Sequence, residues 1–150
     1  MEIIFYNNGK SQSIENYVKG KFNGTQKYYY ENGNLKEIKN FKMDVPSGEF
    51  INYFENGKIK RKLLYIDGKP EGEEVFYNES GQIVIKSNFL NGERHGEQLC
   101  FYDNGVLSYK SFCVNGLKEG ETIYYDENGN IIKTLIYEKE QIIRCTGKCD

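Results

Sequence analysis

The sequence predicts an all-β protein: an elongated, single twisted antiparallel sheet, a meander built from six β-hairpin repeats of 24 residues. Three observations predict this fold. The 150-residue chain has no Ala but 16 Gly, 13 Tyr and 9 Phe, so it lacks the best helix former and is rich in residues typical of strands and turns. Its glycines recur at a fixed interval, and apolar residues alternate on both sides of Asn-Gly pairs.

Glycines recur with a period of 24 residues in three separate series, and only Gly147 lies outside them. Because no insertion or deletion interrupts the spacing, we interpret residues 1–150 as one repeat array without separate domains inside it. The copies cover about 1–24, 25–48, 49–72, 73–96, 97–120 and 121–144, and a C-terminal tail covers 145–150. The series are Gly9, Gly33, Gly57, Gly81, Gly105 and Gly129; Gly24, Gly48, Gly72, Gly96 and Gly120; and Gly20, Gly68, Gly92 and Gly116.

The first glycine series marks the turn of a β-hairpin in each copy. In the third copy, Ile51 and Tyr53 precede a Glu-Asn-Gly segment and Ile59 follows it. A two-residue Asn-Gly turn would pair Tyr53 with Lys60, whereas a three-residue loop closed by a left-handed glycine would pair Tyr53 with Ile59. We favour the second turn, because it gathers the aromatic and aliphatic columns, Tyr65 included, on one side of the sheet. It also requires glycine, since other residues adopt a positive φ only at a cost.

A second connection returns the chain from one copy to the next. In the third copy it covers residues 67–72, Asp-Gly-Lys-Pro-Glu-Gly, which we expect to form a wider loop with two glycines at its bends. Pro46 and Pro70 occupy the same position of two such loops, where a fixed φ and a missing N–H suit a turn. Each copy therefore contributes two antiparallel strands, and we expect contacts only between neighbouring copies.

Composition excludes several classes of protein. The net charge of −2 and the pI of about 5.6 argue against a general nucleic-acid binder, which would carry a basic stripe. No apolar run approaches the roughly 18–20 residues that a membrane helix needs. Residues 1–7 show no positively charged and apolar leader pattern, so we expect a cytoplasmic location. The four cysteines have no framework spacing and are interpreted as free thiols in a reducing compartment.

Three segments carry a resemblance to a known family. Residues 49–59 read Glu-Phe-Ile-Asn-Tyr-Phe-Glu-Asn-Gly-Lys-Ile, residues 65–73 read Tyr-Ile-Asp-Gly-Lys-Pro-Glu-Gly-Glu, and residues 91–97 read Asn-Gly-Glu-Arg-His-Gly-Glu. This pattern resembles the MORN-repeat variant family over residues 1 to about 137, and bacterial members of this kind are often labelled YwqK-type antitoxins. The resemblance implies a non-enzymatic binding module; interaction, scaffold and lipid head-group roles are associated with such arrays. Fold alone does not identify the partner.

Neither a catalytic centre nor a metal or cofactor site is predicted. His95, the single histidine, falls in a loop position that is polar in the other copies, so we interpret it as a surface turn residue. Cys145 and Cys149 have the spacing of half a zinc site, but Cys113 replaces an aromatic residue of a core column and Cys100 lies mid-strand. We interpret Cys100 and Cys113 as half-buried thiols, and the role of the other two is not predicted.

Two sets of residues are candidates for binding a partner. A row of glutamates follows the loop glycine, either as a solvated charge row or as an acidic ladder for a basic partner. Aromatic residues on the face opposite the first columns are either exposed, as at interaction sites, or covered by flanking long side chains. Together we expect an acidic, aromatic-rich, one-sided surface. Its candidate residues are Tyr28, Tyr30, Phe54, Phe76, Tyr102, Tyr124, Glu49, Glu73, Glu97 and Glu121.

These observations lead to a protein-binding repeat module, most specifically an antitoxin or immunity-type protein that binds and occludes a partner toxin. The alternative is a MORN-type scaffold that associates with membrane lipid surfaces or organises other proteins. An acidic chain without a polybasic cluster is poorly suited to anionic membranes, so a protein partner is favoured over lipid. The sequence identifies neither the partner nor the oligomeric state.

Overall fold

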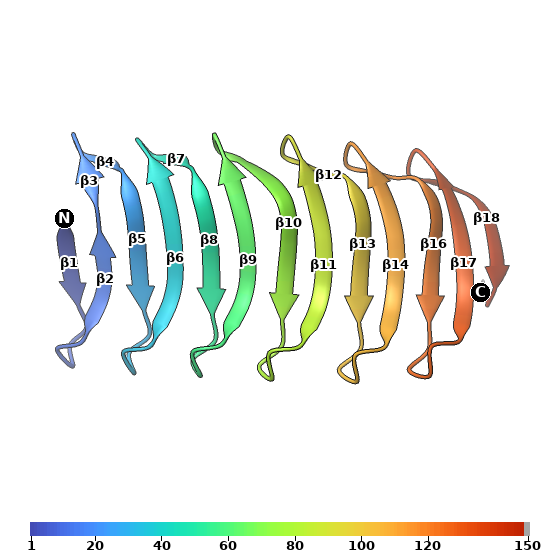
Figure 1. The fold of residues 1–150 in the computed structure, drawn as a ribbon, viewed down its shortest axis with the longest axis horizontal. Helices are drawn as coiled ribbons and strands as arrows, with labels where there is room; N and C mark the ends of the chain where they lie inside the picture. Colours follow the sequence, from blue (N-terminus) through green and yellow to red (C-terminus); the bar gives the residue numbers. More distant parts are fainter. Residues whose placement is uncertain (149–150) are drawn as a thin grey trace.

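A computed structural model describes residues 1–148 of the chain. All regular structure in this part is β, and no helix that could span a membrane is found in it. Sixteen strands form one antiparallel sheet, in which successive hairpins stand side by side from the N-terminus to the C-terminus (Figure 1). The predicted fold class is confirmed.

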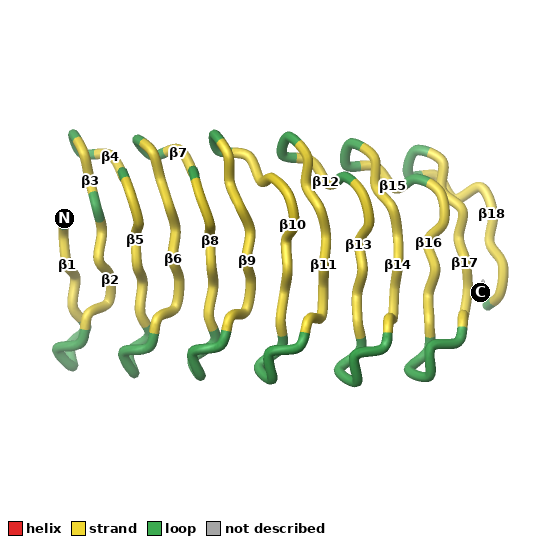
Figure 2. Tube along the Cα trace, viewed as in Figure 1, coloured by secondary structure: helices red, strands yellow, loops and turns green. Residues whose placement is uncertain are grey.

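Each copy contributes a hairpin of two long strands. The first strands are β1 (Glu2–Phe5), β5 (Gly24–Tyr29), β8 (Gly48–Tyr53), β10 (Lys69–Tyr77), β13 (Gly96–Phe101) and β16 (Gly120–Tyr125). The second strands are β2 (Ser11–Glu15), β6 (Leu35–Lys42), β9 (Ile59–Ile66), β11 (Ile83–Leu90), β14 (Leu107–Val114) and β17 (Ile131–Glu138), and β18 (Gln141–Gly147) ends the sheet. Short strands lie in the connections between copies: β3 (Tyr17–Val18), β4 (Lys21–Phe22), β7 (Val45–Pro46), β12 (Glu93–Arg94) and β15 (Leu117–Lys118). Figure 2 shows the turns within copies along one long edge of the sheet, where the strands of each hairpin meet, and the connections between copies along the opposite long edge.

The turn within each copy has the predicted three-residue geometry. In the third copy Tyr53 pairs with Ile59, the Phe54 N–H donates to the Lys58 carbonyl at 2.8 Å, and the Gly57 N–H donates to the Phe54 carbonyl at 2.9 Å. Gly57 has φ = +84°, and all six glycines of its series have φ between +81° and +95°. The glycine is therefore required by a left-handed position that closes the loop.

A β-bulge follows this turn in every copy and changes which residues share a face. Beyond the pair of Tyr53 with Ile59 the register shifts by one, so that Asn52 pairs with Arg61, and Lys60 is the extra residue. Beyond the bulge, alternate side chains change sides. The ring of Tyr65 consequently lies 4.5 Å from that of Phe50, away from Ile51 and Tyr53. The expectation that Tyr65 shares a face with these two residues is wrong, because it assumed an uninterrupted ladder.

The connection between copies is tighter than predicted. Asp67 and Gly68 have φ of +47° and +82°, as a two-residue type I′ turn requires, and the flanking Ile66 and Lys69 pair directly. The segment 67–72, predicted as a wide loop, is therefore mostly strand, and Pro70 pairs with Tyr65 within it. The other connections have the same turn with positive φ at both residues.

The two faces of the sheet have different chemistry. Consecutive residues point to opposite faces, as Glu73 and Glu74 show. Glu73 forms an ion pair with Lys86 on one face, whereas Glu74 forms an ion pair with Arg61 on the other. We name the face with Glu73 the Glu–Lys face and the face with Glu74 the aromatic face. The aromatic face carries, among others, Tyr28, Phe50, Phe76 and Tyr124. A chain of ring contacts, two stacked, one edge-to-face and one tilted, runs through Tyr17, Phe22, Phe41, Phe50 and Tyr65.

The interior is thin and largely polar. Gln26, Ser87, Ser111 and Thr122 are the largest fully buried side chains. Gln26 is accommodated because its amide replaces a piece of the ladder: its Oε1 accepts the Asn16 N–H at 2.6 Å and its Nε2 donates to the Asn16 carbonyl at 2.9 Å. Rings and long side chains cover these positions, so the aromatic face supplies the core of a single-layer sheet.

We expect Gly57→Ala to lower the free energy of unfolding by about 1 kcal/mol, because a Cβ strains a left-handed residue. No atom lies within 4 Å of the position of that Cβ, so backbone strain is the cause rather than a clash. Urea denaturation measures the change. Gly57→Asn is the control and should lose less, because Asn tolerates this conformation; equal stability of all three proteins would contradict the assigned turn.

Candidate binding surface

The two predicted sets of binding residues lie on opposite faces of the sheet. The glutamates belong to the Glu–Lys face, and the aromatic residues belong to the aromatic face or to the turns beside it. All four glutamates are exposed, and all six aromatic residues are half-buried. The expectation of one surface that is both acidic and aromatic is wrong, because the strand period of two separates the two columns. A flat partner can cover only one of these sets.

The glutamate row is part of a ladder of both charges. Glu73 forms an ion pair with Lys86 at 2.7 Å, and Glu97 forms one with Lys110 at 2.6 Å. The hydrogen bond that the Lys110 ammonium donates to Glu97 raises the pKa of Lys110. Because lysines neutralise these two carboxylates, half of the glutamate row offers little net negative charge to a basic partner.

Two of the six aromatic candidates link neighbouring copies. The Tyr30 hydroxyl donates to the Tyr53 carbonyl at 2.7 Å, and the Tyr102 hydroxyl donates to the Tyr125 carbonyl at 2.7 Å. Tyr6 makes the equivalent bond. The asparagines of the turns act alike: the amides of Asn8, Asn32, Asn56 and Asn104 donate to carbonyls of the following turn. The recurrence of Asn before Gly was visible in the sequence, but its bond across copies was not.

Cations cover the rings of the aromatic face. The Lys60 Nζ lies 5.6 Å from the ring centre of Phe54, the Arg61 Cζ lies 5.4 Å from that of Phe76, and Lys133 Nζ lies 4.7 Å from that of Tyr124. Equivalent contacts join Lys36 to Tyr30 and Lys39 to Tyr28. Long side chains thus lie over five of the six candidate rings, which remain half-buried. Burial raises the pKa of Tyr28, Tyr30 and Tyr124.

A hollow of about 170 Å³ lies among these contacts, over β5, β6, β8, β9 and β10. Its charged wall is formed by Lys36, Lys60 and Arg61, and its apolar wall includes the rings of Tyr30 and Phe76. Asn52 also lines it and donates through Nδ2 to Glu37 at 2.8 Å. The hollow combines three cations with two flat rings, a combination suited to an acidic group beside an apolar one.

Arg61 is held in place by a buried carboxylate. Its Nε and Nη2 lie 2.7 and 2.6 Å from Oε1 of Glu74, which is only 3% exposed. The Ser87 hydroxyl donates to the other carboxylate oxygen at 3.2 Å. Sequence reasoning missed this cluster, which has no equivalent in the other copies. The position of Glu74 is also a glutamate in the first copy, Glu2, but no other copy has an arginine in place of Arg61: these positions are Ser13, Glu37, Ile85, Tyr109 and Lys133.

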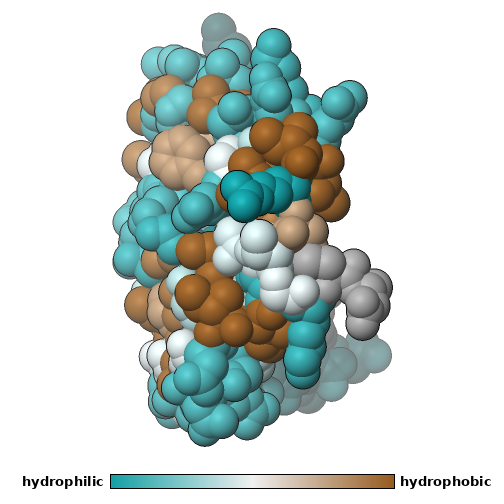
Figure 3. All heavy atoms as spheres, turned by 90° about the vertical axis from the view of Figure 1, so that its right-hand side faces the viewer, coloured by the Kyte–Doolittle hydropathy of each residue, from teal (hydrophilic) through white to brown (hydrophobic). Residues whose placement is uncertain are grey.

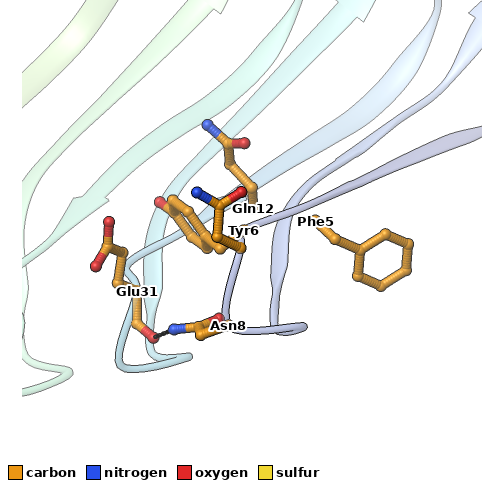
Figure 4. Close-up of a pocket in the computed structure, with 6 residues that line it drawn as sticks. Phe5, Tyr6, Asn8, Gln12 and Glu31 are labelled. Carbon is orange, nitrogen blue, oxygen red and sulfur yellow. Dashed lines mark hydrogen bonds between the residues drawn. The ribbon is translucent and has the colours of Figure 1, made fainter.

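A second hollow at the N-terminal turn has different chemistry. It has a volume of about 390 Å³ and is lined by Tyr6, Asn8, Gln12 and Glu31 together with Phe5 and Asn7. Figure 4 shows the Phe5 ring directed away from the other labelled side chains, and the Asn8 amide bonded to the Glu31 carbonyl. No cation lines this hollow, so it lacks the charge of the one around Arg61.

Among the described residues, the single histidine and the cysteines have structural roles or no partner-binding feature. The His95 Nδ1 accepts the Asn115 N–H at 3.5 Å, in the position where Glu71 and Glu119 accept the equivalent N–H of the next turn. Cys100 and Cys113 are free thiols, and burial raises the pKa of both. Cys145 is disulfide-bonded, so the expectation of a free thiol is wrong there, and Cys149 lies outside the described residues. Residues 1–148 contain no group of three His, Cys, Asp or Glu side chains placed to hold a metal ion.

Glu74→Ala should lower the free energy of unfolding by about 3 kcal/mol, because it leaves the Arg61 guanidinium and the Ser87 hydroxyl without their buried partner. Glu73→Ala is the matched control, since it removes the neighbouring carboxylate from an exposed ion pair and should cost less than about 0.5 kcal/mol. Chemical denaturation of both variants gives the comparison. Similar losses for the two would contradict the assignment of Glu73 and Glu74 to different faces.

Phe54→Tyr should raise the free energy of unfolding by about 1 kcal/mol, because the added hydroxyl meets the Tyr77 carbonyl, the equivalent of the acceptor used by Tyr30. Tyr30→Phe removes such a bond and should lower stability by a similar amount. Thermal denaturation of the pair measures both changes. If neither variant differed from the natural protein, these hydroxyls would not connect the copies.

Comparison with known proteins gives a family match and partial matches to solved structures. No curated protein matches the chain. Among the solved structures that match are a mutant of S. aureus TarM in complex with fondaparinux, alpha-GlcNAc-glycerol and UDP, with a TM-score of 0.41 and 14% identity over 72% of this chain and 21% of that chain. TarM also matches, with a TM-score of 0.40 and 15% identity over 71% of this chain and 20% of that chain. The chain therefore spans about a fifth of the length of these structures.

The model of the MORN repeat variant family matches five segments that together make up most of the chain: 22–43, 46–67, 70–91, 94–115 and 118–139. Consecutive matches begin 24 residues apart, in the same period as the glycines. Proteins with such repeats are generally non-enzymatic interaction or scaffold modules. On this evidence the chain belongs to the MORN repeat variant family.

Proposed function

We propose that this protein is an antitoxin or immunity-type protein that binds a partner toxin and occludes its working surface. The proposal includes no catalysis. One observation carries it: the sheet is a single layer whose aromatic face is lined by half-buried rings and cations over several copies. Half-buried aromatic residues and arginine are enriched at protein interfaces, where they supply most of the binding energy.

The occlusion hypothesis also follows from the shape of the sheet. An open layer offers a long surface and no enclosed reaction chamber; the hollows that line it are shallow and are formed between neighbouring hairpins. Such a surface is suited to covering a partner over a wide area. The Glu–Lys face is a weaker candidate, because its ion pairs already satisfy much of its charge.

The test begins with the tagged full chain expressed in its native host. We expect it to recover a co-encoded protein as a stoichiometric complex. That protein, expressed alone in a second host, should arrest growth, and co-expression of the chain should restore growth. Phe76→Ser on the aromatic face should weaken the rescue, whereas Leu64→Ser on the opposite face should not; circular dichroism checks that both variants fold. Failure to recover a partner, or a partner without toxicity, would contradict the antitoxin function.

A scaffold on a lipid surface is the second candidate, and one observation favours it. The edge formed by the connections between copies exposes an aliphatic residue in most copies: Val18, Val45, Ile66, Leu90, Val114 and Leu117 are 36–52% exposed. At the C-terminal end of the sheet, Figure 3 shows hydrophobic patches that are separated by hydrophilic residues. Flotation with anionic vesicles decides between the candidates: co-flotation, lost on Ile66→Ser, would favour the scaffold.

A further inference from the structure

The hollow around Arg61 holds positive charge that the protein itself does not neutralise. Lys36 and Lys60 line it, and among residues 1–148 neither ammonium forms an ion pair with a carboxylate. Their contacts are with the rings of Tyr30 and Phe54, at 5.6 Å each. Lys39 differs, because Glu37 neutralises it at 2.9 Å. Two ammonium groups are therefore available to an incoming anion.

Arg61 adds a donor whose orientation is fixed before any partner binds. Glu74 holds one edge of the guanidinium through two N–H groups, and the Phe76 ring lies against it at 5.4 Å. A guanidinium has five N–H donors, so three remain after these contacts. Because the Arg61 side chain is already ordered, it loses less conformational entropy when a carboxylate binds than a mobile side chain would lose.

The surroundings of the hollow favour a short acidic segment over an extended polyanion. The exposed carboxylates Glu31, Glu55 and Glu79 lie in the turns at the same edge of the sheet, one in each copy. Within a Debye length of about 10 Å, they would repel the continuous charge of a nucleic acid or an anionic bilayer. Burial raises the pKa of Tyr30, and so does the charge of Glu55. Because Tyr30 lines the hollow, every added charge of a polyanion brings further repulsion, whereas a single acidic side chain adds only one. An apolar neighbour of that side chain can pack on the rings.

We propose that the hollow lined by Tyr30, Lys36, Asn52, Lys60, Arg61 and Phe76 receives an acidic side chain from an exposed, acidic and aromatic segment of the partner protein. This inference rests on the proposed function, since it assigns the contact site and the partner's chemistry to the same binding event. It reverses the polarity predicted from the glutamate row: the partner's contact is acidic rather than basic.

The probe is an acetylated and amidated heptapeptide, Ser-Gly-Glu-Phe-Glu-Gly-Ser, titrated into the isotopically labelled full chain and followed by NMR. A second peptide with lysines in place of both glutamates is its control. We expect the acidic peptide to shift signals of residues that line the hollow and to bind roughly tenfold more tightly than the basic one, with an affinity that falls as salt is added.

Charge reversal at the hollow tests the residues. The double variant Lys36→Glu with Lys60→Glu should lower the affinity for the acidic peptide roughly tenfold. Lys27→Glu with Lys62→Glu makes the same charge change on the Glu–Lys face and should leave the affinity unchanged. Loss of binding in both double variants, preference for the basic peptide, or no binding of either would overturn the proposal. So would binding to phosphatidylserine vesicles that is lost only on Lys36→Glu with Lys60→Glu.

A parallel purification from the native host separates this inference from the proposed function. We compare the natural protein with the double variant Lys36→Glu with Lys60→Glu, the hollow variant. If both recover the same toxic partner equally well, the antitoxin function stands, and the hollow is not the contact site. If the natural protein recovers no such partner, the proposed function fails whatever the peptide does. Loss of the partner in the hollow variant alone supports both.

Discussion

The structure depends on the backbone ladder between the second strand of one copy and the first strand of the next. These bonds join β2 to β5, β6 to β8, β9 to β10, β11 to β13 and β14 to β16, so each hairpin is completed by its neighbours. Side chains add a second set of links at both edges: the asparagines and tyrosines of the turns at one edge, and residues such as Glu71 and Glu119 at the other. This arrangement satisfies the backbone N–H and C=O groups that a single-layer sheet with a thin interior leaves close to solvent, and so stabilises the sheet.

A regular ladder also explains why the two faces differ. Because the side-chain period is two, a column of identical residues stays on one face along the whole array. The glutamate row and its ion pairs with Lys86 and Lys110 lie on one face, and most rings with cations over them lie on the other. The central copies interrupt this regularity on the aromatic face, where the buried Glu74 orders Arg61 next to two lysines without ion pairs. Deviations from a repeat are where a binding surface gains specificity, since identical copies offer identical contacts.

Much of the fold could be predicted from the glycine spacing, because a left-handed turn position tolerates few other residues. The same reasoning paired Tyr53 with Ile59 correctly. It could not foresee the bulge, because the extra residue has no common chemistry: it is Gln12, Lys36, Lys60, Val84, Ser108 and Ile132 in the six copies. The error placed Tyr65 on the wrong face. At the candidate site, the aromatic columns were visible in the sequence. Glu74 and Arg61, however, meet only through cross-strand pairing. The cations over the rings depend on side-chain directions that a linear pattern does not contain.

The central claim is that the protein is a one-dimensional array whose copies are interchangeable in their ladder bonds. Deleting residues 97–120 tests it directly, because the new junction of Gly96 with Glu121 repeats the natural Gly96-Glu97 step. The account predicts a folded, all-β protein by circular dichroism that unfolds cooperatively in urea, with a denaturant slope reduced in proportion to the lost surface. Deletion of residues 97–108, half a period, should abolish this transition. If the full-period deletion unfolded the chain as completely as the half-period deletion, the claim would be contradicted.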